Sequence, residues 1–356
     1  MISGFVLPLF ASLLSLVFGY QEAEMVFVGD AMQHKAQLDA AKAGNDSYDF
    51  SSYFKDIEDI IGCADFAVVN LETPVGARPY DGYPCFSAPV EFVDALADAG
   101  FDMFLTANNH TLDRGARGLR STIALLDDLG LHHVGTYSND SARAASLPKV
   151  VDVNGFKVGF LNYTYGTNGI NPRDGVVVDY IDRTKIKADV DSLRAHDAEL
   201  ITVCIHWGDE YKLLPNKSQR HLADFLEAIG VDMIIGGHPH VIQPMEFRPN
   251  RYYPDKNVFL VYSLGNFCSN MKTADTRGGA LAKVRLFRGE NRKATLQSAS
   301  YRLLFTVPGT NPKNNFKVLK AENVSEGLWQ SRAKEFCRRA HAIFDEHNIA
   351  VPEIKD

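Results

Sequence analysis

The sequence predicts a layered α/β fold, because strand signals and helix signals alternate along most of the chain. Five short apolar runs with strand character end on residue types that can bind a metal. These runs are residues 25–28, 66–69, 103–106, 201–205 and 233–235. Loops at the carboxyl ends of parallel strands share one edge of an open sheet. We therefore expect the five strand ends to meet at one metal site.

Length and composition indicate an ordinary globular protein. The chain has 356 residues, of which 46% are hydrophobic, enough for a large core. No stretch rich in Pro, Gly and Ser divides it, so we expect one catalytic-type domain with appendages. The net charge of −7 argues against a broad basic surface, and we expect no nucleic-acid partner. The five scattered cysteines indicate neither a disulfide framework nor a zinc finger.

The amino-terminal segment is predicted to be a leader. Residues 2–18 are almost continuously apolar, and residues 19–23 resemble the exit region of a secretory signal, although no basic residues precede the apolar core. The run is just long enough for an uncleaved membrane anchor, and a buried strand or helix is a third interpretation. We assign residues 1–23 to a signal peptide or membrane anchor. The protein is then expected to be exported, on the periplasmic or extracellular face.

Helices and strands are predicted in turn along the rest of the chain. Five segments have helical periodicity: residues 49–61, 88–99, 112–129, 183–196 and 218–229. Asn154-Gly155 predicts a tight hairpin turn. Residues 163–180 are expected to form a long loop near the site. Three further segments are predicted to be strands of a second sheet: residues 258–264, 279–287 and 293–300.

The strongest local signal for a metal site is His238-Pro239-His240. In an extended segment, residues i and i+2 point to the same side, and Pro disfavours helix in the residue before it. Both imidazoles are therefore predicted to face one ion. Loops also carry such pairs by chance, so this motif alone leaves the ligand role open.

Three other positions each have a structural alternative. His206 follows a strongly apolar strand, where a single His is more often part of the core or its rim. Asp30 follows Gly29 and has the alternative of a helix N-cap. Glu72 has the alternative of an ordinary loop residue before Pro74. Their occurrence together at strand ends favours metal ligands.

Asn109 and His110 connect the metal site with chemistry. An amide oxygen can bind a divalent ion, and an adjacent His can give a proton to a leaving oxygen. Asp113 either orients the His110 imidazole or caps the helix that begins near Leu112, and the sequence leaves both open. A mixed set of carboxylate, amide and imidazole ligands suits Mn, Fe or Zn better than Ca.

Five motifs occur in an order that resembles a known family. They are Gly29-Asp30-Ala31-Met32, Asn70-Leu71-Glu72 and the segments 109–115, 206–211 and 237–243. Together they resemble the CapA family of bacterial capsule and poly-γ-glutamate synthesis proteins, over residues 25–287. That family is similar in turn to the calcineurin-like metallophosphoesterases. The resemblance implies a four-layer α/β/β/α sandwich, which we assign to residues 24–310. Residues 325–347 carry a helical pattern with many charges, so we assign residues 311–356 to a C-terminal helical extension.

The resemblance also implies a role for each site residue. The metal ligands would be Asp30, Glu72, Asn109, His206, His238 and His240. Asp30 and His240 would bind the first ion, Glu72 would bridge, and the other three would complete the shell of the second ion. His110 would be the general acid, and the role of Asp113 beside it stays open between orienting the imidazole and capping the helix.

Two departures from the phosphoesterase pattern concern the first ion. Met32 stands where the pattern has a His, and Asn70-Leu71-Glu72 replaces a Gly-Asp-x-x-Asp segment. His34 is nearby, but its spacing from Asp30 argues against a simple exchange. The sequence therefore leaves open whether the site holds one divalent ion or two.

Two functions are compatible with these features. The first is a metal-dependent hydrolase in capsule or poly-γ-glutamate biosynthesis, with a phosphoester or anionic polymer as substrate. The second is a non-catalytic accessory protein of an envelope polymer synthesis or export complex that keeps the metal-binding fold. A third, less favoured, is a module that grips an anionic polymer through the metal and Arg78, Arg114 or Arg173. A complete ligand set with His110 beside it favours the hydrolase.

Overall fold

The computed structural model describes residues 20–290, 293–325 and 327–355. The apolar run at residues 2–18, predicted to be a leader, lies outside the described residues, and the leader stays a prediction. Gln21 to Ala23, at the predicted end of that leader, begin strand β1 (Gln21–Ala31). No helix in the described part of the chain is long and apolar enough to cross a membrane.

The first sheet is built around β1. Its order is β16-β15-β14-β1-β2-β3-β4, and β13 also pairs with β1. The strands are β2 (Phe66–Leu71), β3 (Met103–Leu105), β4 (His132–Val134), β13 (Asn266–Cys268), β14 (Gly278–Arg288), β15 (Ala294–Val307) and β16 (Lys317–Lys320). Strands β1 to β4 run parallel, whereas β14, β15 and β16 are antiparallel. The carboxyl ends of β1, β2 and β3 therefore lie at one edge.

The second sheet has the order β11-β12-β10-β9-β7-β6. Its strands are β6 (Lys149–Val153), β7 (Phe156–Thr164), β9 (Leu200–His206), β10 (Met233–Gly237), β11 (Met245–Pro249) and β12 (Asn257–Val261). The turn between β6 and β7 has positive φ at Asn154 (48°) and Gly155 (85°), so the predicted hairpin is confirmed. Strands β5 (Thr136–Tyr137) and β8 (Val177–Val178) form a separate small pair.

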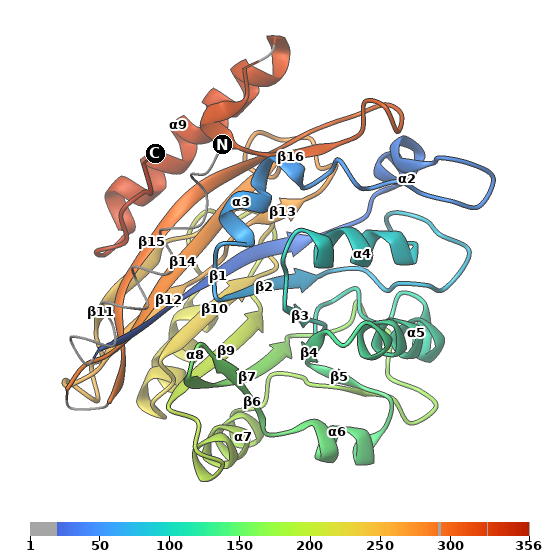
Figure 1. Ribbon diagram of the computed structural model, residues 1–356. Helices are drawn as coiled ribbons and strands as arrows, with labels where there is room; N and C mark the ends of the chain where they lie inside the picture. The colour runs from blue at the N-terminus through green and yellow to red at the C-terminus, as the bar shows by residue number, and fades with distance from the viewer. Residues whose placement is uncertain (1–19, 291–292, 326, 356) are drawn as a thin grey trace, which may run out of the picture.

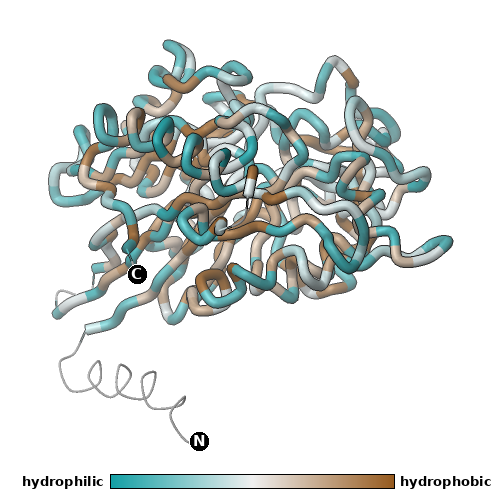
Figure 2. Tube along the Cα trace, turned by 90° about the horizontal axis from the view of Figure 1, so that it is seen from above, coloured by the Kyte–Doolittle hydropathy of each residue, from teal (hydrophilic) through white to brown (hydrophobic). Residues whose placement is uncertain are grey.

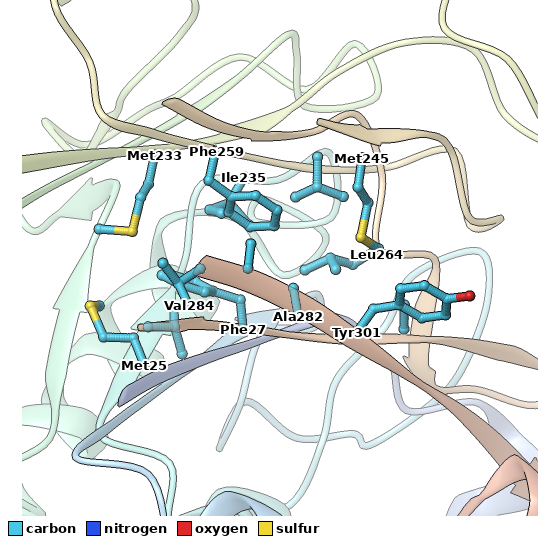
Figure 3. Packing of buried hydrophobic residues seen from close by; sticks show 14 of the residues in the cluster. Met25, Phe27, Met233, Ile235, Met245, Phe259, Leu264, Ala282, Val284 and Tyr301 are labelled. Atoms are coloured by element: carbon cyan, nitrogen blue, oxygen red, sulfur yellow. The ribbon is translucent and has the colours of Figure 1, made fainter. Parts of the chain in front are cut away.

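The two sheets pack face to face around the largest apolar cluster of the described residues. Figure 3 shows Met25 and Phe27 of the first sheet pointing toward Met233 and Phe259 of the second. The hydrophobic segments in Figure 2 run mainly along the central strands, and hydrophilic segments lie mostly outside them. The burial of this interface supplies much of the driving force for folding, because apolar surface leaves water on both sheets.

Helices cover the outer faces of both sheets. They are α2 (Lys35–Ala41), α3 (Glu58–Ile61), α4 (Val90–Asp98), α5 (Gly115–Asp128), α6 (Asp140–Ser146), α7 (Arg183–Ala195) and α8 (Lys217–Ala228), with short 3-10 turns η1 (Lys55–Ile57) and η2 (Ala321–Asn323). Residues of α3 and α4 pack on the first sheet, and those of α7 and α8 pack on the second. The predicted α/β/β/α sandwich is therefore confirmed (Figure 1).

Two secondary-structure predictions were wrong. Residues 279–287 and 293–300 lie in β14 and β15 of the first sheet, not in a second sheet, because β14 pairs with β1 along its length. Residues 49–61 are helical only from Lys55 onward. The Asp49 carboxylate accepts hydrogen bonds from the backbone N–H and the hydroxyl of Ser51, and such local bonds compete with a helix.

The carboxyl-terminal part contributes to both layers. Strand β16 pairs with β15, and helix α9 (Gly327–His347) buries Phe336 and Phe344 in the cluster between the sheets. Figure 1 shows α9 lying across the end of the molecule formed by β14 and β15. The division at residue 310 stays a prediction, although β16 beyond it completes the first sheet.

Candidate metal centre and active site

The predicted ligands gather where the carboxyl ends of both sheets meet. Asp30 is in β1, Glu72 follows β2, Asn109 follows β3, His206 ends β9, and the two remaining histidines follow β10. All six predicted ligands are at most 3% exposed: Asp30, Glu72, Asn109, His206, His238 and His240. The sequence expectation that separate strand ends form one polar cluster agrees with this arrangement.

A bulge at Gly29 sets the position of Asp30. The β1–β2 register shifts between Val28 and Asp30, and the Asp30 N–H donates to Gly265 O at 3.0 Å. The backbone just before β13 approaches so closely that a Cβ at Gly29 would lie 1.8 Å from Gly265 O. Only a residue without a side chain fits there, and the bulge directs the next carboxylate into the site.

We expect Gly29→Ala to destabilise the protein by about 3 kcal/mol, because a Cβ would force β1 and β13 apart. Denaturant unfolding followed by circular dichroism measures this. The matched control is Gly166→Ala, where no atom lies within 4 Å of the added Cβ, and a change below about 0.5 kcal/mol is expected. Equal stability of the two variants would contradict the close approach.

Asp30 is held by neighbours that favour its charged form. Its Oδ1 accepts a hydrogen bond from the Asn70 amide at 2.8 Å, and its Oδ2 lies 3.1 Å from His240 Nδ1. Burial alone would raise the Asp30 pKa, but the His240 imidazole and the Asn70 amide outweigh burial and hold this pKa below its usual range. The result is a buried anion ready to bind a cation.

Glu72 occupies the centre of the cluster. Its Oε1 lies 3.6 Å from Nε2 of His206, at the end of β9, and 3.8 Å from Nε2 of His240, which follows β10. No described residue makes a hydrogen bond to this buried oxygen. Burial and the negative charge of Asp30 raise the Glu72 pKa well above its usual value. An unsatisfied carboxylate oxygen between two imidazoles fits a divalent cation as its natural partner.

Two of the three predicted histidine ligands have a pKa below its usual range, which favours the neutral form that binds metals. His206 Nε2 lies 2.8 Å from Asn109 Oδ1. Burial, followed by the charge of His238, lowers the His206 pKa well below its usual value. Burial and then His240 lower the His238 pKa to about 4. Deprotonated imidazoles beside carboxylate and amide oxygens form the mixed donor set that first-row divalent metals prefer.

The His238-Pro239-His240 segment is not extended. The prediction that an extended backbone turns both imidazoles to one side was therefore wrong. His238 has φ of 96° and His240 has φ of 57°, both in a region that residues with side chains rarely adopt. The two rings nevertheless lie 5.9 Å apart at the site. Such backbone strain persists where surrounding structure enforces it, as at ligand-binding sites.

His110 and Asp113 form a buried pair beside the ligands. His110 Nδ1 lies 2.8 Å from Asp113 Oδ2, and the same oxygen accepts the Phe86 N–H at 2.8 Å. Helix α5 begins at Gly115, with Arg114 rather than Asp113 as its N-cap. Of the two roles that the sequence left open, the geometry thus favours orientation of the imidazole. The Phe86 ring meets the His110 ring edge-on at 4.6 Å.

Two polar side chains were absent from the predicted site. Asn70 donates to Asp30, as described above, and its Nδ2 also lies 3.4 Å from Glu72 Oε2. Glu210 is exposed, yet a carboxylate oxygen lies within 4.8 Å of ligand nitrogens of His238 and His240. Both occur within the motifs on which the resemblance rests, and position within those motifs is the signal that could have identified them.

Met32 and His34 take no part in the described ligand groups. Met32 is buried, and its N–H donates to Cys268 O at 2.9 Å. His34 Nδ1 is 3.2 Å from the Asn270 N–H donor and 3.1 Å from Gln37 Oε1. The groups that could hold an ion are Asp30, Glu72 and His206 in one case, and Glu210, His238 and His240 in the other.

Comparison with known families agrees with these motifs. A family model described as bacterial capsule synthesis protein PGA_cap matches residues 24–271. The chain belongs to this family. It is 31% identical to the PGA biosynthesis protein CapA of Bacillus subtilis, over 73% of this chain and 67% of that protein. It is 29% identical to the capsule biosynthesis protein CapA of Bacillus anthracis, over 75% of this chain and 64% of that protein.

More distant similarities also exist. A Mycobacterium tuberculosis protein, described as a probable polyglutamine synthesis accessory protein, is 28% identical over 51% of each chain. The solved structure of Haemophilus influenzae NAD nucleotidase aligns with a TM-score of 0.47 at 13% identity, covering 90% of this chain and 56% of that chain. The chain spans about two thirds of the length of the two CapA proteins.

Proposed function

We propose that this PGA_cap family protein is a metal-dependent hydrolase of phosphoester bonds that acts during capsule or poly-γ-glutamate synthesis. One observation carries the proposal: a His110–Asp113 pair lies beside a buried set of imidazoles and carboxylates. A site that only bound a structural metal would not need a paired imidazole next to it. Membership of the family supports the polymer context.

The residues present fit a divalent cation. Glu72 Oε1 is a buried acceptor without a hydrogen-bond partner among the described residues, and two imidazole nitrogens face it. Asp30, Glu72, Asn109, His206, His238 and His240 would hold one ion or two, with Mn, Fe or Zn as the expected metals. When bound, such an ion polarises a phosphoryl oxygen and makes a water more acidic.

The remaining steps belong to the chain's own side chains. His110 Nδ1–H would donate to Asp113, which fixes the tautomer and leaves Nε2 as the atom that exchanges a proton with the leaving oxygen. The Phe86 N–H and the Phe86 ring hold this pair in place. His206 and Asn109, joined at 2.8 Å, would orient each other toward the ion.

The experiment combines metal analysis with a hydrolysis assay. Purified protein is expected to retain a divalent metal and, with added Mn²⁺, to cleave bis(4-nitrophenyl) phosphate or 4-nitrophenyl phosphate. His206→Ala is expected to lose both metal and turnover. The control is His196→Ala, because His196 lies at the end of α7 and its imidazole bonds the Ser192 carbonyl. Metal retention without turnover on any phosphoester, in a protein that cells need for polymer formation, would rule out the hydrolase.

An accessory role is the second candidate. It is supported by Met32, which stands where a phosphoesterase would have a ligand, and by the accessory description of the Mycobacterium tuberculosis relative. In this role the protein would join a polymer synthesis complex and use the metal for binding alone. Export through the amino-terminal segment, to the periplasmic or extracellular face, is part of either proposal.

A further inference from the structure

We infer that Glu210 is a metal ligand, which completes a second cation position with His238 and His240. Ligand atoms of these three residues all lie within 4.8 Å of one another. A carboxylate and two imidazoles at that separation are the kind of donor set that zinc or manganese takes. This inference rests on metal binding at the proposed site but not on hydrolysis.

Both imidazoles of this second position are buried, and one of them is incompletely satisfied. His238 is 3% exposed and His240 is 1% exposed. His238 Nδ1 has no hydrogen-bond partner among the residues that the structure describes. A buried polar atom without a partner costs free energy unless a ligand satisfies it, so this nitrogen points to a group that the protein chain does not supply.

The loop that carries Glu210 is fixed to the histidine segment. The Tyr211 N–H donates to Pro239 O at 2.8 Å, between the two histidines. The Gln243 amide donates to Lys212 O at 2.7 Å. Positive φ angles at Gly208 (93°) and Tyr211 (65°) turn the chain on either side of Glu210. These bonds hold the backbone of the Glu210 loop beside the histidine segment.

Charge also favours a third carboxylate here. Asp30 and Glu72 alone supply two carboxylates for as many as two divalent ions, and Met32 supplies no ligand. Glu210 adds negative charge on the solvent side of His238 and His240. Because it is exposed while the other ligands are buried, the second ion would be the more exchangeable of the two.

The test is the metal-binding stoichiometry of Glu210→Gln, measured by calorimetric titration of metal-free protein with Mn²⁺ and by elemental analysis after dialysis. The wild type is expected to bind two ions. Glu210→Gln should bind one ion normally and the second at least about tenfold more weakly. Loss of a residue that only orients a metal ligand already lowers metal affinity by about that factor, so loss of a ligand should lower it at least as much. The control is Asp209→Asn, the neighbouring exposed acid, whose Oδ2 accepts from Asn216. It should bind both ions.

The outcomes separate this inference from the hydrolase proposal. Two ions in the wild type and one in Glu210→Gln support the ligand role, whether or not any phosphoester is cleaved. Equal stoichiometry and affinity in the wild type and Glu210→Gln overturn it, and so does a wild type that binds a single ion. Circular dichroism of both variants checks that an exposed substitution has left the fold intact.

Discussion

Replacing His110 by Ala is expected to slow hydrolysis of phosphoesters with alkyl leaving groups by about 10²- to 10⁴-fold. The reason is that an alkoxide leaves poorly unless it is protonated, and His110 is the paired imidazole beside the ligand cluster. Metal content is expected to stay that of the wild type, because the six predicted ligands are unchanged. Steady-state rates with a methyl or glyceryl phosphodiester measure the effect.

The leaving group supplies the control for this prediction. A 4-nitrophenolate leaves without protonation, so the same His110→Ala protein should lose far less activity on 4-nitrophenyl esters. Asp113→Asn should lower the rate for alkyl esters and change its pH profile, because the imidazole would no longer be held in one tautomer. Equal losses on both kinds of ester would show that the substitution damaged the site rather than removed a proton donor.

Replacing Glu72 by Gln is expected to abolish stabilisation by metal. Added Mn²⁺ at 100 times its dissociation constant should stabilise the wild type by about 2.7 kcal/mol, by mass action alone. Glu72→Gln loses the oxygen that faces His206 and His240, and should gain little. Without metal, Glu72→Gln is expected to be as stable as the wild type or more stable. Burial and the Asp30 charge disfavour an ionised Glu72, and an amide removes that cost.

Thermal unfolding with and without Mn²⁺, after treatment with a chelator, measures both effects. The control is Glu58→Gln, because Glu58 is exposed in α3 and should leave the metal response unchanged. A Glu72→Gln protein that responds to Mn²⁺ as strongly as the wild type would remove Glu72 from the ligand set. A metal-free Glu72→Gln protein much less stable than the wild type would contradict the electrostatic argument.

The clustering of the predicted ligands could be anticipated because its signal is local. Each of these residues lies at or near the end of a short apolar run, and parallel strands bring their carboxyl ends to one edge of a sheet. The meeting of two such edges, one from each sheet, could not be predicted in this way. The bulge at Gly29 could not be predicted in this way, since it depends on the close approach of the Gly265 backbone, from a segment far along the chain. The glycine was evident, but its neighbour was not.

Other features could not be predicted because they depend on tertiary contacts. Strand β14 has the composition of any buried strand, and only its pairing with β1 places it in the first sheet. The positive φ angles of His238 and His240 contradict the extended segment that a Pro between them suggests. The loop of Glu210 is tied to the histidine segment by the bonds from Tyr211 to Pro239 and from Gln243 to Lys212. The motif that contains Glu210 was evident in the sequence, but these contacts were not.

The division of the ligands between the two sheets has a consequence for folding. Asp30, Glu72 and Asn109 come from the first sheet, whereas His206, His238 and His240 come from the second. The contact between the His238 N–H and Asp30 Oδ2 joins residues 208 positions apart. A contact of such long range closes a large loop, and the entropy of that loop must be overcome before the contact stabilises the chain. Because each sheet carries three of the six predicted ligands, the proposed ion would be retained only after both sheets have packed together.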